Sequence, residues 1–220
     1  MTATPADRFA GIDLACRRSE RLVFTRLDFM VEAGGALLLT GPNGSGKSSL
    51  LRVLAGLIKP YRGRLEHNGS SLGDDPARHR ELVAYLGHQD AIKPMLTVAE
   101  SVGFWAGMRG QAHLASGALA AMDLTSLGDL PGRFLSSGQR RRTALARVIA
   151  TGAPIWLLDE PTVGLDVRSI AALEAALADH RAAGGTVIAA THAPIALPGA
   201  ATLDLAAFDA RLADDEADAA

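Results

Sequence analysis

The sequence predicts an α/β fold whose core is a mostly parallel β-sheet with helices on both faces. Three short apolar runs, at residues 36–40, 154–160 and 186–192, alternate with segments whose apolar residues recur at helical spacing. Continuous apolar runs suit strands that are covered on both faces, and strands that alternate with helices build parallel sheets. With 48% hydrophobic residues among 220, the chain can form one domain with a sizeable core.

The N-terminal part of the chain carries signals for a strand, a helix and a hairpin. Residues 21–35 alternate in part between apolar and polar side chains and end in a Gly-Gly turn, which predicts a half-buried strand. Residues 48–60 have apolar side chains at helical spacing, and we expect Pro60 to end this helix. The pair Asn68-Gly69 is a strong signal of a hairpin turn.

The segment from about residue 90 to 145 is predicted to be a mostly helical insertion. Thr97 and Glu100 match a capping box that opens a helix through about Arg109. Alanine-rich helical sequence follows, to Ala121. Because strand character returns at residue 154, the helices interrupt the α/β core and do not form a separate domain.

We predict one domain over residues 1–210 and an acidic, disordered tail over residues 211–220. No apolar run approaches the roughly 20 residues that a membrane-spanning helix needs. The N-terminus lacks a basic segment followed by an apolar core, so we expect no secretory signal. The single cysteine, Cys16, cannot form an internal disulfide and is expected to be a small packing residue.

A glycine-rich sequence predicts a phosphate-binding loop. Residues 41–48, GPNGSGKS, match G-x-x-x-x-G-K-[ST] and lie between a predicted buried strand and a predicted helix. Glycines let successive backbone N–H groups point at an anion, and the following helix adds its positive N-terminal end. Lys47 can reach the β- and γ-phosphates, and the Ser48 hydroxyl can bind Mg²⁺. The predicted phosphate-binding residues are Gly41, Pro42, Asn43, Gly44, Ser45, Gly46, Lys47, Ser48 and Ser49.

Two acidic residues, Asp159 and Glu160, end the apolar run that begins at residue 154. They are expected at the edge of the sheet where open α/β sheets bind ligands. Asp159 would hold Mg²⁺ directly or through water, and Glu160 would orient and deprotonate an attacking water. With the phosphate loop, these acids predict a P-loop NTPase, although a soluble P-loop kinase would carry the same loop and a similar acid.

The sequence LSSGQ, residues 135–139, resembles the signature motif of the ATP-binding cassette (ABC) ATPases, whose commonest form is LSGGQ. The resemblance implies the ABC type of P-loop NTPase, with a mostly parallel sheet core, an N-terminal antiparallel β subdomain and an inserted helical subdomain. It also implies a homodimer of ATPase subunits, packed head to tail, in which each signature motif covers the ATP of the other subunit. The motif residues are Ser136, Ser137, Gly138 and Gln139, with Ser137 in place of the usual first glycine.

Three further positions follow the order of motifs in ABC ATPases. Gln89 matches the glutamine loop, which senses Mg²⁺ and the attacking water, and Asp166 in VGLD matches the aspartate that communicates across the dimer. His192 matches the switch histidine, which contacts the γ-phosphate. The resemblance therefore implies ATP hydrolysis with ATP and Mg²⁺ as cofactors. Its catalytic residues would be Glu160, His192 and Gln89, and the metal would lie at Ser48, Gln89 and Asp159.

Three consecutive arginines, Arg140, Arg141 and Arg142, follow the signature motif. Consecutive side chains on a helix point about 100° apart, so these arginines cannot form one flat basic patch. We expect solvated charges near the start of a helix over residues 139–150, with room for one of them near a phosphate. The net charge of −2 and the pI of about 6.3 also argue against a dedicated nucleic-acid binder.

Residues 86–105, LGHQDAIKPMLTVAESVGFW, resemble the ATP-binding subunits of the cytochrome c maturation system, a haem exporter of the ABC family. The resemblance implies integral membrane partners and a peripheral position on the cytoplasmic face of the bacterial inner membrane. Dimer closure and reopening would then drive haem export or the release of a haem-loaded chaperone. The histidines offer no persuasive haem site, so we expect that this subunit does not bind haem itself.

Other functions stay open at this point. The ATPase subunit of another ABC importer or exporter would share these motifs, and co-purified membrane proteins would distinguish it. A soluble P-loop kinase would transfer phosphate to a small acceptor and not to water. A soluble ABC ATPase of DNA maintenance or translation usually has a long coiled-coil insertion or tandem cassettes, and the sequence shows neither.

Two regions leave a choice of roles. Where ABC ATPases have an aromatic residue that stacks on adenine, this chain has CRRSER, residues 16–21. An arginine can stack on a base through its planar guanidinium, and Arg17, Arg18 and Arg21 are the candidates. Phe104, Trp105 and Met108 either line a groove that receives a helix of the membrane subunit or pack inside the helical insertion.

Overall fold

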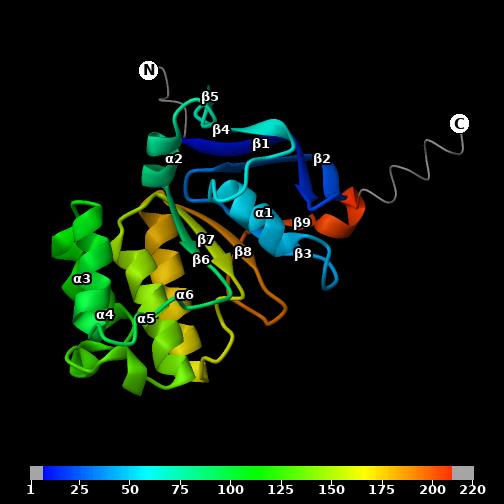
Figure 1. The fold of residues 1–220 in the computed structure, drawn as a ribbon. Helices are drawn as coiled ribbons and strands as arrows, with labels where there is room; N and C mark the ends of the chain where they lie inside the picture. Colours follow the sequence, from blue (N-terminus) through cyan, green and yellow to red (C-terminus); the bar gives the residue numbers. More distant parts are fainter. Residues whose placement is uncertain (1–6, 210–220) are drawn as a thin grey trace, which may run out of the picture.

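In the computed structural model, which describes residues 7–209, the chain forms two β-sheets and a group of helices (Figure 1). One sheet has five strands and the other has four. The predicted α/β fold is confirmed, including an antiparallel sheet near the N-terminus. The predicted acidic tail, residues 211–220, lies outside the described residues.

The five-stranded sheet has the order β6-β7-β8-β3-β9, and all of its neighbouring strands are parallel. Every residue of β7 and β8 is buried, as expected for central strands that are covered on both faces. The strands are β3 (Ala36–Thr40), β6 (Val83–Leu86), β7 (Ile155–Asp159), β8 (Thr186–Ala190) and β9 (Ala201–Asp204).

The four-stranded sheet has the order β2-β1-β4-β5 with antiparallel neighbours. The predicted hairpin turns at Asn68 and Gly69, whose φ angles of +55° and +77° are of the left-handed kind that a type I′ turn needs. The strands are β1 (Arg8–Arg18), β2 (Arg21–Glu32), β4 (Arg62–His67) and β5 (Ser70–Ser71).

Helices α3, α4 and α5 contact one another and lie away from the antiparallel sheet (Figure 1). The predicted capping box opens α3, because the Glu100 N–H donates to Thr97 Oγ1 at 3.1 Å and the Thr97 N–H donates to Glu100 Oε2 at 2.8 Å. Within residues 7–209, no helix is both long and apolar enough to cross a membrane. The helices are α1 (Lys47–Leu54), α2 (Pro76–Leu82), α3 (Val98–Met108), α4 (Ala115–Ala121), α5 (Ser137–Ala150) and α6 (Val167–Ala182).

Two clusters of buried apolar side chains hold the parallel sheet between them. Successive residues of a strand point to opposite faces, so β3, β6, β7 and β8 contribute to both clusters. The first cluster joins the antiparallel sheet and α1 to one face of the sheet through Leu37, Leu39, Leu157 and Ile188. The second joins α3, α4, α5 and α6 to the other face through Leu86, Trp156, Leu158, Val187 and Ala189.

Helix α1 is shorter than predicted, and Pro60 does not end it. The helix ends at Leu54, and Gly56 follows with a φ of +68°. Gly56 and the next residue donate their backbone N–H groups to carbonyls of the last turn at 3.0 and 2.9 Å. This is the Schellman pattern, in which glycine adopts the left-handed conformation that ends a helix. Gly56 therefore ends the helix four residues before Pro60.

Candidate nucleotide-binding site

The predicted site residues gather at the carboxyl edge of the parallel sheet. Strand β6 leads towards Gln89, β7 ends at Asp159, and β8 is followed by His192. The strand register aligns Leu39 and Asp159 with Ala190, so the residues that follow these positions are neighbours. Parallel topology thus places segments that are distant in the sequence at one edge, where α/β sheets bind ligands.

The phosphate loop, residues 41–46, joins β3 to α1 and depends on glycine at two positions. Gly41 and Gly46 have φ angles of +126° and +104°, which side chains rarely adopt. A methyl group at Gly41 would lie 2.8 Å from Ser45 Oγ, and one at Gly46 would lie 2.7 Å from Val23 Cγ1. The loop therefore needs both the conformational freedom and the small size of glycine.

Lys47 opens α1, and its side chain folds back over the loop. Its Nζ donates to the carbonyls of Gly41 at 2.7 Å and Pro42 at 3.0 Å, and the residue is only 8% exposed. An ammonium group has three donors, so one remains for a bound ligand. The ammonium lies where the loop and the start of α1 favour an anion.

Ser48 and Asp159 meet beside the phosphate loop. Ser48 Oγ donates to Asp159 Oδ1 at 3.0 Å. Asp159 is 2% exposed, and its Oδ2 is buried with no hydrogen-bond partner among residues 7–209. A buried carboxylate oxygen without a partner is costly, and a divalent cation would satisfy it. Hydroxyl and carboxylate oxygens are the hard ligands that Mg²⁺ prefers, so these residues fit that ion.

Glu160 and His192 lie together at the end of β7 and β8. Glu160 has a φ of +49°, an uncommon conformation for a residue other than glycine and one that clusters at functional sites. Its N–H donates to the Ala190 carbonyl at 2.8 Å. The His192 N–H donates to Glu160 Oε2 at 3.2 Å, and His192 Nε2 lies 3.8 Å from Glu160 Oε1. The structure therefore brings two predicted catalytic residues together.

The signature turn, residues 135–139, forms the start of α5, which begins at Ser137 and not at Gln139 as predicted. The Gln139 N–H donates to Ser136 Oγ at 3.2 Å, and the Ser136 N–H donates to Gln139 Oε1 at 2.8 Å, which makes a capping box. A methyl group at Gly138 would lie 2.9 Å from the Gly164 carbonyl oxygen. Glycine is thus needed at 138, whereas Ser137 is exposed and free of such contact.

Gln89 and Asp166 lie on loops that flank the acidic pair. The Gln89 side chain is exposed on the loop after β6. Asp166 caps α6 by accepting the Ser169 N–H at 2.8 Å. Hydrogen bonds from the side chain and backbone of Ser169 lower the pKa of the Asp166 carboxyl. Asp166 therefore has a structural role at a helix start beside any role across a dimer.

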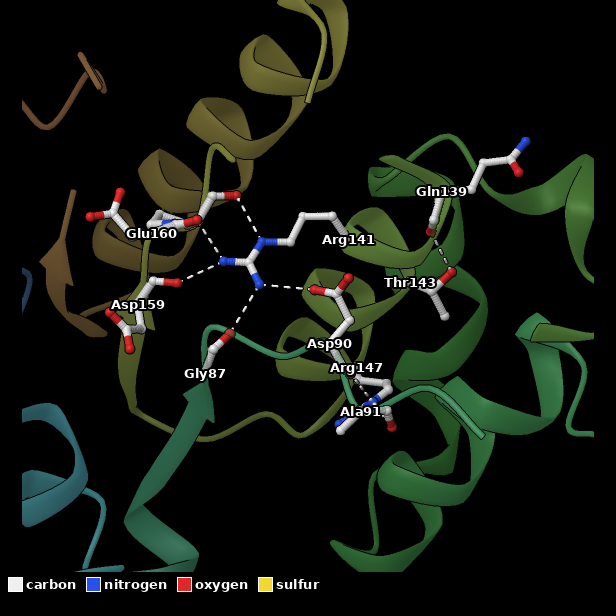
Figure 2. A network of polar contacts seen from close by, with 10 residues as sticks. Gly87, Asp90, Ala91, Gln139, Arg141, Thr143, Arg147, Asp159 and Glu160 are labelled. Carbon is white, nitrogen blue, oxygen red and sulfur yellow. Dashed lines mark hydrogen bonds and ion pairs between the residues drawn. The ribbon is translucent and has the colours of Figure 1, made fainter. Parts of the chain in front are cut away.

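Arg141 is buried, which contradicts the prediction that all three arginines are solvated. It is 4% exposed, and its guanidinium lies between the loop after β6 and the end of β7 (Figure 2). It donates to the Gly87 carbonyl at 3.0 Å and forms an ion pair with Asp90 at 2.9 Å. On the other side it donates to the carbonyls of Asp159 and Glu160 at 2.6 and 2.5 Å.

The neighbouring arginines point elsewhere, as their splay on a helix predicts. Arg140 donates to the Leu135 carbonyl at 2.8 Å, and Arg142 donates to the carbonyl of Asp123 at 2.9 Å. A sequence signal could have identified Arg141 as the buried one. It lies three, four and seven residues before the buried apolar stripe of α5, which is formed by Ala144, Leu145 and Val148.

The turn between β1 and β2 carries the arginines considered for base stacking. The Arg17 guanidinium lies 4.7 Å from the centroid of the Tyr61 ring, and Arg18 pairs with Arg21 across the turn. Cys16 is fully buried, as expected of a packing residue, and burial raises the pKa of its thiol.

Three apolar residues of α3 lie at the surface and not inside the helical segment. Phe104, Trp105 and Met108 are 51%, 38% and 64% exposed. Two cations lie beside them, because Lys93 is 5.9 Å from the Phe104 ring and Arg147 is 5.0 Å from the Trp105 ring. Of the two roles considered for these residues, the structure therefore favours an exposed surface over packing.

Comparison with known proteins gives the family. The ABC transporter family model matches residues 24–163, which run from β2 past the acidic pair. A curated relative from Paramagnetospirillum magneticum, named cytochrome c biogenesis ATP-binding export protein CcmA, is 53% identical over 205 residues, covering 91% of this chain and 94% of the relative. The relative of the same name from Rhodospirillum rubrum is 54% identical over 202 residues, covering 91% and 86%.

Solved structures agree with this assignment. An ATP-binding subunit of an ABC transporter superimposes with a TM-score of 0.77 at 26% identity, over 84% of this chain and 79% of that one. An ABC transporter ATP-binding protein from Pyrococcus furiosus shares the fold with a TM-score of 0.80 at 22% identity, over 92% and 99%. The chain therefore belongs to the ABC transporter family and is an ABC-type ATPase subunit.

Proposed function

We propose that this chain is the ATP-hydrolysing subunit of an ABC transporter complex that serves cytochrome c biogenesis, by haem export or by release of a haem-loaded chaperone. The observation that carries the proposal is the meeting of Glu160 and His192 beside a phosphate loop, in a chain 53% identical to a cytochrome c biogenesis ATP-binding export protein. The geometry of the site supports ATP hydrolysis, and the similarity to these relatives supports a role in cytochrome c biogenesis.

ATP is bound by the phosphate loop. The backbone N–H groups of residues 41–49 surround the β- and γ-phosphates, and Lys47 uses its remaining donor on them. The planar guanidinium groups at the β1–β2 turn offer a stacking surface for the base. These contacts require no change in the loop, because Lys47 is already held over it by two carbonyls.

Glu160 is the base for hydrolysis. Its carboxylate accepts a proton from water that attacks the γ-phosphate, while Gln89 orients that water. His192 contacts the γ-phosphate from the end of β8. Since the His192 N–H donates to Glu160 Oε2 at 3.2 Å, Oε1, which lies 3.8 Å from His192 Nε2, is the oxygen that would accept the proton from water.

Ser48, Asp159 and Gln89 are the residues that would hold Mg²⁺. When bound, the ion would supply positive charge to the phosphate groups. Asp159 is suited to this task because its Oδ2 is buried beside Ser48 with no hydrogen-bond partner among the described residues.

A homodimer completes each site. The N-terminus of α5 presents free N–H groups and the hydroxyl of Ser136, which suit a γ-phosphate supplied by the other protomer. Ser137 and Gly138 allow the close approach, and Gln139 fixes the turn through its capping box. The loop that ends at Asp166 touches this turn, because Gly164 lies against Gly138.

The exposed residues of α3 form the contact with a membrane partner. We define this docking surface as Phe104, Trp105 and Met108 with Lys93 and Arg147. Apolar rings flanked by cations fit an amphipathic helix with acidic residues from an integral membrane subunit. The chain would then sit peripherally on the cytoplasmic face of the inner membrane, with residues 90–145 as the helical subdomain of one domain spanning 1–210.

Affinity purification from detergent-solubilised membranes, with an ATPase assay of the product, tests the proposal. We expect multi-span and haem-handling membrane proteins to co-purify, and to be lost when Phe104 and Trp105 are both changed to serine. Leu57→Ser is the matched control, because Leu57 is 64% exposed and lies outside the docking surface. Co-purification of transporter subunits unrelated to c-type cytochromes would contradict the pathway, and phosphate transfer to a small acceptor would contradict the reaction.

A further inference from the structure

The guanidinium of Arg141 has all of its hydrogen-bond donors in use. A guanidinium carries five N–H donors in a rigid fork. Nε donates to the Pro161 carbonyl at 3.4 Å, Nη1 to Gly87 O and Asp90 Oδ1, and Nη2 to the carbonyls of Asp159 and Glu160. The residue is buried and lies beneath the signature turn on α5. Five donors thus meet five acceptors on two other segments (Figure 2).

The acceptors surround the residue that would act as the base. Glu160 lies in a left-handed conformation that costs free energy unless its surroundings impose it. Its N–H is held by Ala190, and its carbonyl is held by Arg141. Arg141 also donates to the carbonyls of Asp159 and Pro161, on either side of Glu160. The guanidinium therefore fixes three consecutive peptide units, and these orient the Glu160 side chain.

The same guanidinium reaches the segment that carries Gln89. Gly87 and Asp90 lie on either side of the Gln89 loop, and both accept from Nη1. Because Arg141 is also part of the helix that starts at Ser137, one side chain connects three predicted motifs. Removing it would leave four buried or partly buried carbonyls and one carboxylate short of a donor, and an unsatisfied buried polar group is costly.

We infer that Arg141 is a positioning residue for ATP hydrolysis, which holds the backbone at Asp159–Pro161 so that Glu160 stays in place beside His192. The inference rests on the proposed function and deepens it. Arg141 acts through Glu160, because its hydrogen bonds go to the loop after β6 and to the end of β7. The carbonyls of the phosphate loop accept from Lys47 instead. Loss of these hydrogen bonds of Arg141, which we call the Arg141 clamp, should therefore slow ATP turnover and leave the affinity for ATP nearly unchanged.

Lysine is the informative replacement. It keeps the charge but has three donors on a point-like ammonium, so it cannot satisfy five acceptors. We expect Arg141→Lys to lower kcat by about 10- to 100-fold, since small misplacement of a reacting group has effects of this size. The Kd for ATP should stay within about threefold of wild type, because the substitution leaves the contacts that bind ATP in place.

The experiment measures kcat and the Kd for radiolabelled ATP in the complex purified with its membrane partners. Arg142→Lys is the matched control, since Arg142 is one residue away on α5. Within the described part of the chain, its hydrogen bonds and ion pair go to the carbonyls of Met122 and Asp123 and to the Asp123 carboxylate.

The outcomes separate the inference from the proposed function. A folded Arg141→Lys variant with wild-type kcat, a parallel loss of Kd, or an equal loss of kcat in Arg142→Lys would overturn the inference. If Arg141→Lys does not fold, Asp90→Ala decides, because it frees one donor of the clamp, and unchanged kcat would overturn the inference. A wild-type complex that hydrolyses no ATP would refute the proposed function instead.

Discussion

At the residue scale, the site depends on a few side chains whose chemistry the sequence predicts well. Lys47, Ser48 and Asp159 meet because their motifs follow β3 and β7, which both pair with β8, and this is why a local pattern was enough to identify them. The burial of Arg141 was not predicted, because a charged side chain favours solvent and the carbonyls that accept from its guanidinium come from other segments of the chain. The helical period places Arg141 on the buried face of α5, and its charge is tolerated there because backbone carbonyls accept hydrogen bonds from the guanidinium.

Replacing Lys47 with alanine should weaken ATP binding by roughly 10- to 100-fold, the range expected when a charge-assisted hydrogen bond of about 1.5–3 kcal/mol is removed. The loop also loses the donor that holds its carbonyls of Gly41 and Pro42. Equilibrium binding of radiolabelled ATP measures the effect. Lys59→Ala is the control, because Lys59 is exposed beyond α1. Unchanged affinity in Lys47→Ala would exclude the loop as the phosphate site.

Gly138→Ala should impair hydrolysis and destabilise the fold by about 1–3 kcal/mol, the usual cost of overpacking. The added methyl group would lie 2.9 Å from the Gly164 carbonyl oxygen and would push the signature turn away from the VGLD loop. Gly103→Ala serves as control, because a methyl group there meets nothing within 4 Å and alanine favours the helix. Denaturant unfolding and ATPase assays report the two effects. Similar behaviour of both variants would refute this account of Gly138.

At the scale of elements, the strands and helices follow the apolar periodicity, and the failures have local causes. Helix α1 ends at Gly56 because a left-handed glycine closes it, which apolar spacing does not reveal. Strands β1, β6 and β9 were not predicted. Strands β6 and β9 are short and pair with strands that are distant in the sequence, and β1 has register shifts against β2 that interrupt a regular pattern. Helix α6 packs on the sheet partly through His180, whose ring stacks on Trp156 with centroids 3.8 Å apart.

The free energy of unfolding should fall as the pH is lowered from about 6.5 to 4, in part through His180. Burial lowers the pKa of His180 from 6.5 to about 4 in the folded chain. Between pH 6.5 and 4 the unfolded chain therefore binds a proton at His180 that the folded chain does not bind. The free energy of unfolding then changes by up to about 1.4 kcal/mol per pH unit. Above pH 6.5 both states carry the neutral ring, and this contribution to stability is complete.

Denaturant unfolding at several pH values measures this slope. In His180→Gln the slope between pH 6.5 and 4 should be smaller than in wild type, whatever the absolute stability of the variant. His113→Gln is the control, since His113 lies on the surface between α3 and α4. An equal slope in His180→Gln and wild type would show that His180 is not responsible.

At the scale of the whole molecule, the order of the motifs along the chain was sufficient to predict the family and the parallel sheet. The arrangement of the two hydrophobic clusters could not be predicted, because it depends on which face of each strand meets which layer. In the homodimer that we propose, a second protomer brings its signature turn over the triphosphate bound by the first.

The most direct test of that claim is cysteine crosslinking in the Glu160→Gln background. Cys16, the single native cysteine, is buried, so cysteines placed at exposed Asn43 and Ser137 report cleanly. We expect a crosslinked dimer that requires both cysteines and Mg-ATP, in the complex with its membrane partners, because Glu160→Gln blocks the turnover that would reopen it. If the variant binds ATP in that complex and yields only monomers, the account of a shared nucleotide site is wrong.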